Sequence, residues 1–167
     1  MSESMSKQIL STPRDPRIVL GDLVTILLTG KETGGEYSVV EISSVPGGGP
    51  SFLHTHPAAE TFYIISGKFE IYGQSPTGEK YAIPASAGKT VHVPGDTPHG
   101  FANVGTELAT LLAIYEPAGN MELFHAEVGM PVEDPENVNF PDEPPDLNKL
   151  MPVFEKYGIV LIERPGA

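Results

Sequence analysis

The chain contains no cysteine, no tryptophan and few basic side chains, and these absences exclude several classes of protein. Without cysteine it cannot form a disulfide framework, a zinc finger, an iron–sulfur cluster or a thiol nucleophile, so any metal site must use nitrogen and oxygen ligands. Ten Lys and Arg against 22 Asp and Glu give a formal net charge of −12. Because an acidic chain without a basic stripe binds anions poorly, we expect no nucleic-acid partner.

Long apolar segments are also absent. The N-terminal sequence MSESMSKQILSTPRDP lacks the apolar core of a signal peptide, and no uninterrupted apolar run reaches the roughly 18 residues that a membrane-spanning helix needs. We therefore expect a cytoplasmic protein without a membrane partner. The length of 167 residues favours one domain, since a single core usually serves roughly 100–200 residues.

Turn-forming residues are abundant instead. Glycine and proline number 18 and 17, a larger share of the chain than the roughly 12% that is usual. Between Ile18 and Glu116, turn signals separate short apolar runs, none of which repeats at the helical period over a helical length. This part is therefore predicted to be an all-β sandwich or barrel, whose first two strands form a hairpin at Gly34-Gly35. The predicted strands are Leu23–Thr29, Tyr37–Ser44, Phe52–His56, Thr61–Ser66, Lys68–Tyr72, Tyr81–Ile83, Thr90–Val93, Gly100–Asn103 and Leu108–Tyr115.

The sequence changes character after Glu116. Residues 116–148 contain nine acids, six prolines and no Lys or Arg. We predict a short helix at Met121–Val128, then an acidic, proline-rich connector at 131–145. We expect one domain with a short helical C-terminal extension, divided into a barrel core at about 18–116 and an extension at 117–167, together spanning residues 1–167.

A second helix is predicted within this extension. Asp146 would cap its N-terminus, and Gly158 would end it. Pro152 lies inside the pattern and should kink the helix or move its start. Residues Ile159–Ile162 are typical of a last, short strand. The apolar residues at helical spacing are Leu147, Leu150, Met151, Phe154 and Tyr157.

Potential metal ligands gather in two strand-rich segments. His54 and His56 are two residues apart on an extended chain, so both side chains point to one face. The turn that follows reverses the chain and lets Glu60 reach back toward them. His99 follows a second turn. Three imidazoles and one carboxylate in a β-walled pocket suit a divalent first-row metal ion and leave one or two positions open.

Apolar side chains are predicted to surround this metal site. Some of them occupy alternate strand positions on the same face as the histidines, and the others point to the interior from the next strand. The inward positions carry no Lys or Arg. The predicted substrate-pocket residues are Phe52, Phe62, Ile64 and Phe101.

Two segments carry a resemblance to a known family. Residues Gly48–Gly67 fit the first motif of the cupin superfamily, G(x)5HxH(x)3E(x)6G, without a mismatch. Residues Gly88–Asn103 resemble the second motif, G(x)5PxG(x)2H(x)3N, with one departure: the family glycine falls at Asp96, and Gly95 precedes it. This departure is expected to alter the turn locally. The resemblance implies an all-β cupin jelly-roll β-barrel with one divalent transition metal inside, held by His54, His56, Glu60 and His99.

The extension resembles that of bacterial single-domain cupins similar to quercetin 2,3-dioxygenase. This resemblance implies that the metal chelates a flavonol or related enol and that dioxygen opens its ring. Glu60 would then be both ligand and general base, accepting the hydroxyl proton of the substrate. An aromatic small molecule and dioxygen are the expected substrates, and a homodimer is the expected assembly. The ligands would accept Fe, Mn, Ni, Co, Cu or Zn.

Two other functions are compatible with the same set of metal ligands. An isomerase, epimerase or decarboxylase of a small acid would use it, although such a site normally holds its substrate with basic side chains. A non-catalytic cupin that binds a small ligand belongs to a different class. Dioxygen uptake would separate the dioxygenase from this binding module.

The remaining candidates are assigned mainly to structural roles. The covering residues Met121, Leu123 and Phe124 are expected to pack against the core, with a lid over the pocket as the alternative. His92 is expected to be a hydrogen-bonded structural residue. His125 is expected at the surface rather than at the pocket mouth.

Overall fold

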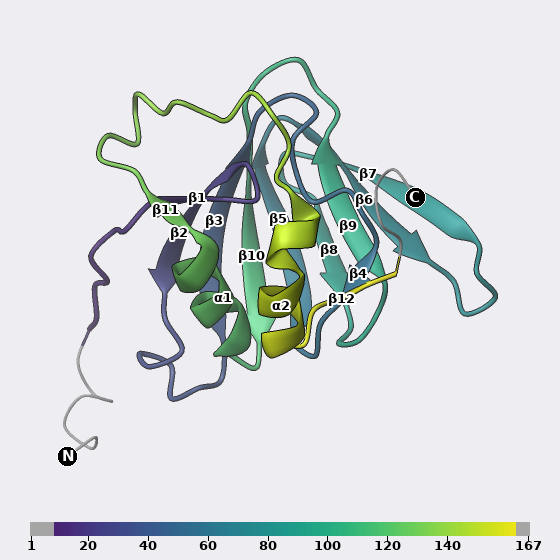
Figure 1. The fold of residues 1–167 in the computed structure, drawn as a ribbon, viewed down its shortest axis with the longest axis horizontal. Coiled ribbons are helices and arrows are strands. Elements are labelled where there is room, and N and C mark those ends of the chain that lie inside the picture. The colour runs from purple at the N-terminus through teal and green to yellow at the C-terminus, as the bar shows by residue number, and fades with distance from the viewer. Residues whose placement is uncertain (1–8, 163–167) are drawn as a thin grey trace.

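The described residues form two antiparallel β-sheets and two helices, which lie on one side of the molecule (Figure 1). The structure is a computed structural model and describes residues 9–162. In chain order the elements are β1 (Arg17–Val19), β2 (Asp22–Leu28), β3 (Ser38–Ser44), β4 (His54–Thr55), β5 (Ala59–Ser66), β6 (Lys68–Gln74), β7 (Lys80–Ser86), β8 (Thr90–Val93), β9 (His99–Asn103), β10 (Ala109–Glu116), α1 (Asn120–Val128), β11 (Met130–Pro131), α2 (Leu147–Lys156) and β12 (Val160–Leu161).

The strand order explains how residues distant in sequence share one interior. The larger sheet has the order β11-β1-β2-β3-β10-β5-β8, and the smaller sheet has the order β12-β4-β9-β6-β7. Consecutive strands β4 and β5 belong to different sheets, as do β5 and β6. The connection between β5 and β6 requires glycine because Gly67 has a φ of 82° and an added Cβ would lie 2.4 Å from the Cβ of Ala109.

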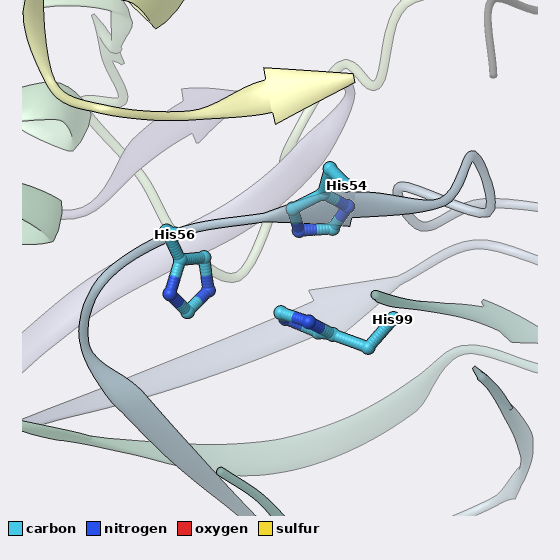
Figure 2. Close-up of side chains that lie close together, drawn as sticks. All are labelled: His54, His56 and His99. Carbon is cyan, nitrogen blue, oxygen red and sulfur yellow. The ribbon is translucent and has the colours of Figure 1, made fainter. Parts of the chain in front are cut away.

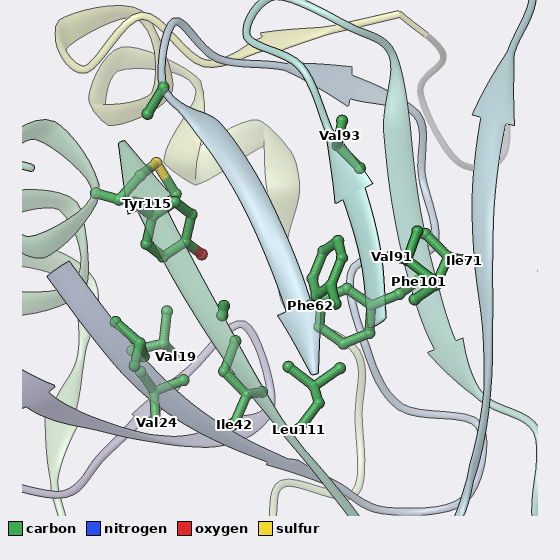
Figure 3. Packing of buried hydrophobic residues seen from close by; sticks show 14 of the residues in the cluster. Val19, Val24, Ile42, Phe62, Ile71, Val91, Val93, Phe101, Leu111 and Tyr115 are labelled. Atoms are coloured by element: carbon green, nitrogen blue, oxygen red, sulfur yellow. The ribbon is translucent and has the colours of Figure 1, made fainter. Parts of the chain in front are cut away.

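The core follows from the alternation of side chains along the strands. In β10, Leu111, Ala113 and Tyr115 point inward at every second position. Figure 3 shows Leu111 beside Phe62 of β5, with Phe101 of β9 nearby. Burial of these apolar groups is the main driving force for the fold. Neither helix of the described residues has the length and apolar character required to cross a membrane.

The all-β prediction is confirmed, with differences at the shortest elements. Strands β1 and β11 were not predicted; they pair with each other through Arg17 and Pro131 and through Ile18 and Met130. Three-residue and two-residue strands are too short to show a period, so only their pairing defines them. Strand β4 contains two residues rather than the predicted Phe52–His56.

Strands β2 and β3 also differ from the expected hairpin. They pair as predicted, but residues 29–37 join them in a loop rather than a two-residue turn. Gly34 and Gly35 lie within this loop with φ values of 69° and 86°. The glycine pair correctly indicates a bend with positive φ values, but this bend is part of a longer loop and not a two-residue turn.

The C-terminal extension forms both predicted helices. Asp146 caps α2 by accepting a hydrogen bond from the backbone N–H of Asn148, at 3.1 Å. The helix begins at Leu147 with Pro152 inside it, so the proline does not move its start. Gly158 follows the end of the helix with a φ of 72°, as expected for a residue after a helix C-terminus.

Helix α1 packs against the hydrophobic core of the barrel through two of the three residues that were expected to do so. Met121 and Phe124 are buried, and the rings of Phe124 and Phe154 stack with centroids 5.6 Å apart. Leu123 is 56% exposed, so its assignment to the covering surface is wrong: it lies on the opposite side of the helix. The two helices therefore contribute to the hydrophobic core of the barrel.

Replacing Phe124 by Ala should destabilise the protein strongly. Because the ring is 1% exposed and stacked on α2, we expect a loss of about 3 kcal/mol in the free energy of unfolding, measured by urea denaturation. Leu123→Ala, one residue away on the same helix, is the matched control and should change stability by less than about 0.5 kcal/mol. Equal effects of the two substitutions would show that α1 is not part of the core.

Candidate metal centre

Three histidines meet at the inner surface of the smaller sheet (Figure 2). His54 in β4 and His99 in β9 are direct cross-strand partners, and their ring centroids are 4.5 Å apart. His56 lies just after β4, and its ring is 4.7 Å from that of His99. Each histidine offers one ring nitrogen to a common position, and these nitrogens lie within 4.8 Å of one another. All three side chains are buried.

Backbone carbonyls fix the orientation of each ring. The Nδ1 atoms of His54, His56 and His99 lie 3.0, 2.8 and 2.8 Å from the carbonyl oxygens of residues 52, 58 and 97, respectively. A carbonyl oxygen only accepts hydrogen bonds, so Nδ1 carries the proton in each ring. The lone pair of the neutral ring is therefore on Nε2. This is the tautomer in which histidine ligates a metal, with an outer hydrogen bond holding the ring.

Glu60 approaches the histidines from the opposite sheet. Its Oε1 lies 3.0 Å from His56 Nε2 and 3.2 Å from His99 Nε2, and the carboxylate is buried. A neutral ring protonated at Nδ1 has its lone pair on Nε2. The Nε2 atoms of His56 and His99 would then both face the Glu60 carboxylate as hydrogen-bond acceptors, with no proton between them. Protons or a cation must separate them. The donor set therefore fits a divalent metal ion, which would accept all of these lone pairs.

The ionisation of this cluster follows from burial and mutual charge. Burial alone would raise the pKa of Glu60, but its contacts with His56 and His99 lower it below its usual range, so the carboxylate stays charged when a proton or a cation is shared with these rings. Burial lowers the pKa of His54 to about 3, and the nearby charge of His99 adds to this effect. Burial also opposes the charged form of His99, but its hydrogen bond with Glu60 and the carboxylate charge raise its pKa overall.

The turns beside the ligands set this geometry. The segment after His56 carries the chain from the smaller sheet to the larger one and brings Glu60 back to within 3.0 Å of His56 Nε2. In the second turn, Asp96 donates its backbone N–H to the carbonyl of His56, at 2.9 Å. Asp96 has a φ of 56°, so it keeps the left-handed conformation of a glycine, which Asp tolerates. Gly95 is required because an added Cβ would lie 2.3 Å from the Pro57 carbonyl oxygen.

A small cavity adjoins the metal ligands. The volume of this cavity is about 50 Å³, which holds a few water molecules at roughly 10–15 Å³ each. Phe52, Phe62 and Phe101 line this cavity, whereas Ile64 is absent from its wall and lies fully buried in the core. None of the residues that form its wall in the described part of the chain is Lys or Arg.

Three polar residues of this cavity were not predicted to lie there. They are Asp22, Tyr115 and His125. The expected surface position of His125 is wrong: the residue is 5% exposed, and its Nδ1 has no hydrogen-bond partner among the described residues. His125 follows Met121 by four residues and adjoins Phe124, so the helical repeat could have placed it on the buried face.

Tyr115 lies between the metal ligands and His125. It pairs with Glu60 across β10 and β5, and its ring is 5.8 Å from His56 and 6.2 Å from His125. Burial and the Glu60 carboxylate raise the pKa of Tyr115 well above its ordinary value, so the side chain stays a neutral phenol. The inward parity of β10 was the sequence signal that could have identified it.

His92 behaves as expected for a histidine outside the site. It is exposed on β8, and its Nδ1 lies 2.8 Å from the hydroxyl oxygen of Thr61 on the neighbouring strand. This contact ties two strands of the larger sheet together on their outer face. His92 therefore has a structural role separate from the three clustered histidines.

Comparisons with known proteins agree with this architecture. Residues 41–115 match the cupin domain family, a range that includes all four proposed ligands. The comparison with curated proteins finds no match. Similar solved structures include a predicted oxalate decarboxylase from Thermotoga maritima, which is 20% identical, with a TM-score of 0.55 and coverage of 66% of this chain and 98% of that one.

Two further structures show the same fold. The polyketide cyclase RemF from Streptomyces resistomycificus is 18% identical, with a TM-score of 0.51 and coverage of 66% of this chain and 78% of that chain. An oxalate oxidase in complex with the substrate analogue glycolate is 24% identical, with a TM-score of 0.52 and coverage of 67% and 62%. At this identity the likeness shows the fold alone. The chain has the cupin jelly-roll fold, and its residues 41–115 match the cupin domain family.

Proposed function

We propose that this protein is a metal-dependent cupin enzyme, and specifically a dioxygenase that opens a flavonol or a related enol or aromatic substrate. The observation that carries the proposal is the set of three oriented imidazoles and one carboxylate beside a largely apolar cavity, with His54, Glu60 and His99 in its wall. The metal would be held by His54, His56, Glu60 and His99. Aromatic side chains on the same wall match the body of an aromatic substrate.

Each group of the site has a defined task in this reaction. The bound metal would polarise the substrate oxygen and bring the substrate together with dioxygen. Glu60, at the junction of cavity and ligands, accepts the proton of the enol hydroxyl. Phe52 and Phe62 keep water away from the reacting oxygen. Both atoms of dioxygen enter the product and the substrate supplies the electrons, so the reaction needs no external reductant.

A decarboxylase or isomerase of a small acid is the second candidate. The observation in its favour is the volume of the cavity, whose roughly 50 Å³ suits a small molecule better than a flavonol. Against it, the cavity wall has no Lys or Arg to pair with a substrate carboxylate. The two candidates differ in their use of dioxygen.

The test is substrate consumption by protein loaded in turn with Fe, Mn, Co and Ni. Each sample is incubated with quercetin without oxygen, and oxygen is then admitted. We expect loss of quercetin with uptake of one molecule of dioxygen per molecule consumed for at least one metal. Failure with all four metals would reject the dioxygenase proposal. Carbon dioxide release from oxalate or malonate without dioxygen uptake would support the second candidate instead.

A further inference from the structure

Asp22 is a buried acid at the edge of the metal cavity that the proposed chemistry does not use. It begins β2, its side chain is 2% exposed, and it forms part of the cavity wall. Its Oδ1 atom has no hydrogen-bond partner among the described residues. A buried polar atom without a partner is costly, which makes a ligand contact a natural explanation for its position.

The backbone around Asp22 holds its side chain inside. Leu20 and Gly21 form the preceding tight turn, with φ values of 50° and 88°. On the far side, a Cβ added to Gly48 would lie 3.4 Å from Asp22 Oδ1, so the glycine-rich loop closes over the carboxyl group. Burial raises the pKa of Asp22 to about 7, and the neighbouring Ser44 hydroxyl, which does not reach hydrogen-bond geometry with Oδ1, opposes this shift in part. A protonated carboxyl can both donate and accept a hydrogen bond.

The register of the larger sheet separates Asp22 from the metal ligands. Leu23, its neighbour, pairs with Ser43, whereas Tyr115 beside Glu60 pairs with Ser38 at the other end of β3. Five residues of extended strand correspond to roughly 16 Å. Val24 and Ile42 line the cavity between these two ends, and Figure 3 shows them together with Val19 below Tyr115. The cavity thus has a metal end, an apolar middle and an acidic end.

We infer that Asp22 is a second anchor of the substrate, forming a hydrogen bond with a hydroxyl or carbonyl group at the end farthest from the metal. This inference rests on the proposed function and names its substrate class: a planar aromatic enol with a further hydroxyl or carbonyl group on a distant ring. A substrate with only the metal-binding enol would leave Asp22 unpaired. The site therefore selects the polyhydroxylated members of the class.

A ligand of this size requires more space than the cavity offers. We propose that the additional space is an outer groove of about 430 Å³, which shares Leu20, Pro50 and Phe52 with the cavity wall. The groove extends to the start of α2, where Asp146 and Leu147 lie. Displacement of the shared wall would join the two spaces, and Leu20 of that wall lies two residues before Asp22.

The test compares two probes that share the enol but differ in distant hydroxyl groups. Quercetin carries them and 3-hydroxyflavone does not. Binding to metal-loaded protein is measured by calorimetry without oxygen. Wild-type protein should bind quercetin at least tenfold more tightly than 3-hydroxyflavone. In Asp22→Leu and Asp22→Ala this ratio should fall below about threefold. Asp22→Asn, which keeps the shape and both hydrogen-bonding functions, should retain most of it.

The possible contrary results are distinct. Equal affinities for the two probes in the wild-type protein would overturn the inference, as would an unchanged ratio in the folded Leu and Ala variants. Absence of binding by both probes would overturn the substrate class. Metal content, measured on the same samples, separates these results from failure of the metal site. Failure of the dioxygenase reaction is separate again, since it is detected only after oxygen is admitted.

Discussion

Replacing His99 by Ala should lower the amount of bound metal at least tenfold, measured by elemental analysis of protein purified without an affinity tag. His99 contributes one of the three converging ring nitrogens and is the cross-strand partner of His54. Even loss of an outer hydrogen-bond partner commonly costs about 10–100-fold in metal affinity, so loss of a ligand should cost at least as much. The remaining lone pairs would also face an unfilled position in a buried site.

His92→Ala provides the matched control for this experiment. His92 is an exposed histidine on β8 with a hydrogen bond to Thr61, so its loss changes the histidine count without touching the cluster. Metal content should remain at the wild-type value in this variant. Equal metal content in the His99 and His92 variants would reject the assignment of the metal centre.

Replacing Glu60 by Gln should slow substrate consumption by about 10²–10⁴-fold, the usual contribution of a general base. Glutamine keeps the size of the side chain and its ability to accept a hydrogen bond near His56 and His99, but it cannot accept the substrate proton. The measurement is the initial rate of quercetin loss with the most active metal. Anaerobic absorption spectra provide a second readout, because wild-type protein should hold the flavonol as its anion and the variant should hold it neutral.

Glu79→Gln is the control for the charge change. Glu79 is exposed beside the turn between β6 and β7, so the substitution removes one negative charge far from the cavity. Its rate should equal that of the wild-type protein. A Glu60→Gln variant that retains both metal and full activity would show that another group accepts the proton. Tyr115 and His125, two buried polar residues of the cavity wall, would then be the candidates for the proton acceptor.

The parts of the site that could be predicted depend on local spacing. A separation of two positions places His54 and His56 on a common face in any extended chain, and the turn that follows brings Glu60 near. His99 and the strand boundaries around it follow from turn signals and alternation. The departure at Asp96 was visible in the sequence, but only the backbone shows that Asp96 itself adopts the left-handed conformation.

The parts that could not be predicted depend on which elements meet in three dimensions. Asp22 faces the cavity because β2 lies in the larger sheet and the glycine-rich loop closes over it. His125 is buried because of the face that α1 turns toward the barrel, and the apolar pattern of this short helix marks that face only weakly. Strand β11 exists only through its pairing with β1. Such long-range partners leave no period in the sequence.

The crossing of the chain between the two sheets has a mechanical consequence. His54 and His99 belong to the smaller sheet and Glu60 to the larger one, so an ion bound to all of them would act as a cross-link between the two halves of the sandwich. Separation of the sheets would then require dissociation of the ion, which couples their opening into one cooperative event. The same few residues that would serve the chemistry would thus also set how slowly the barrel opens.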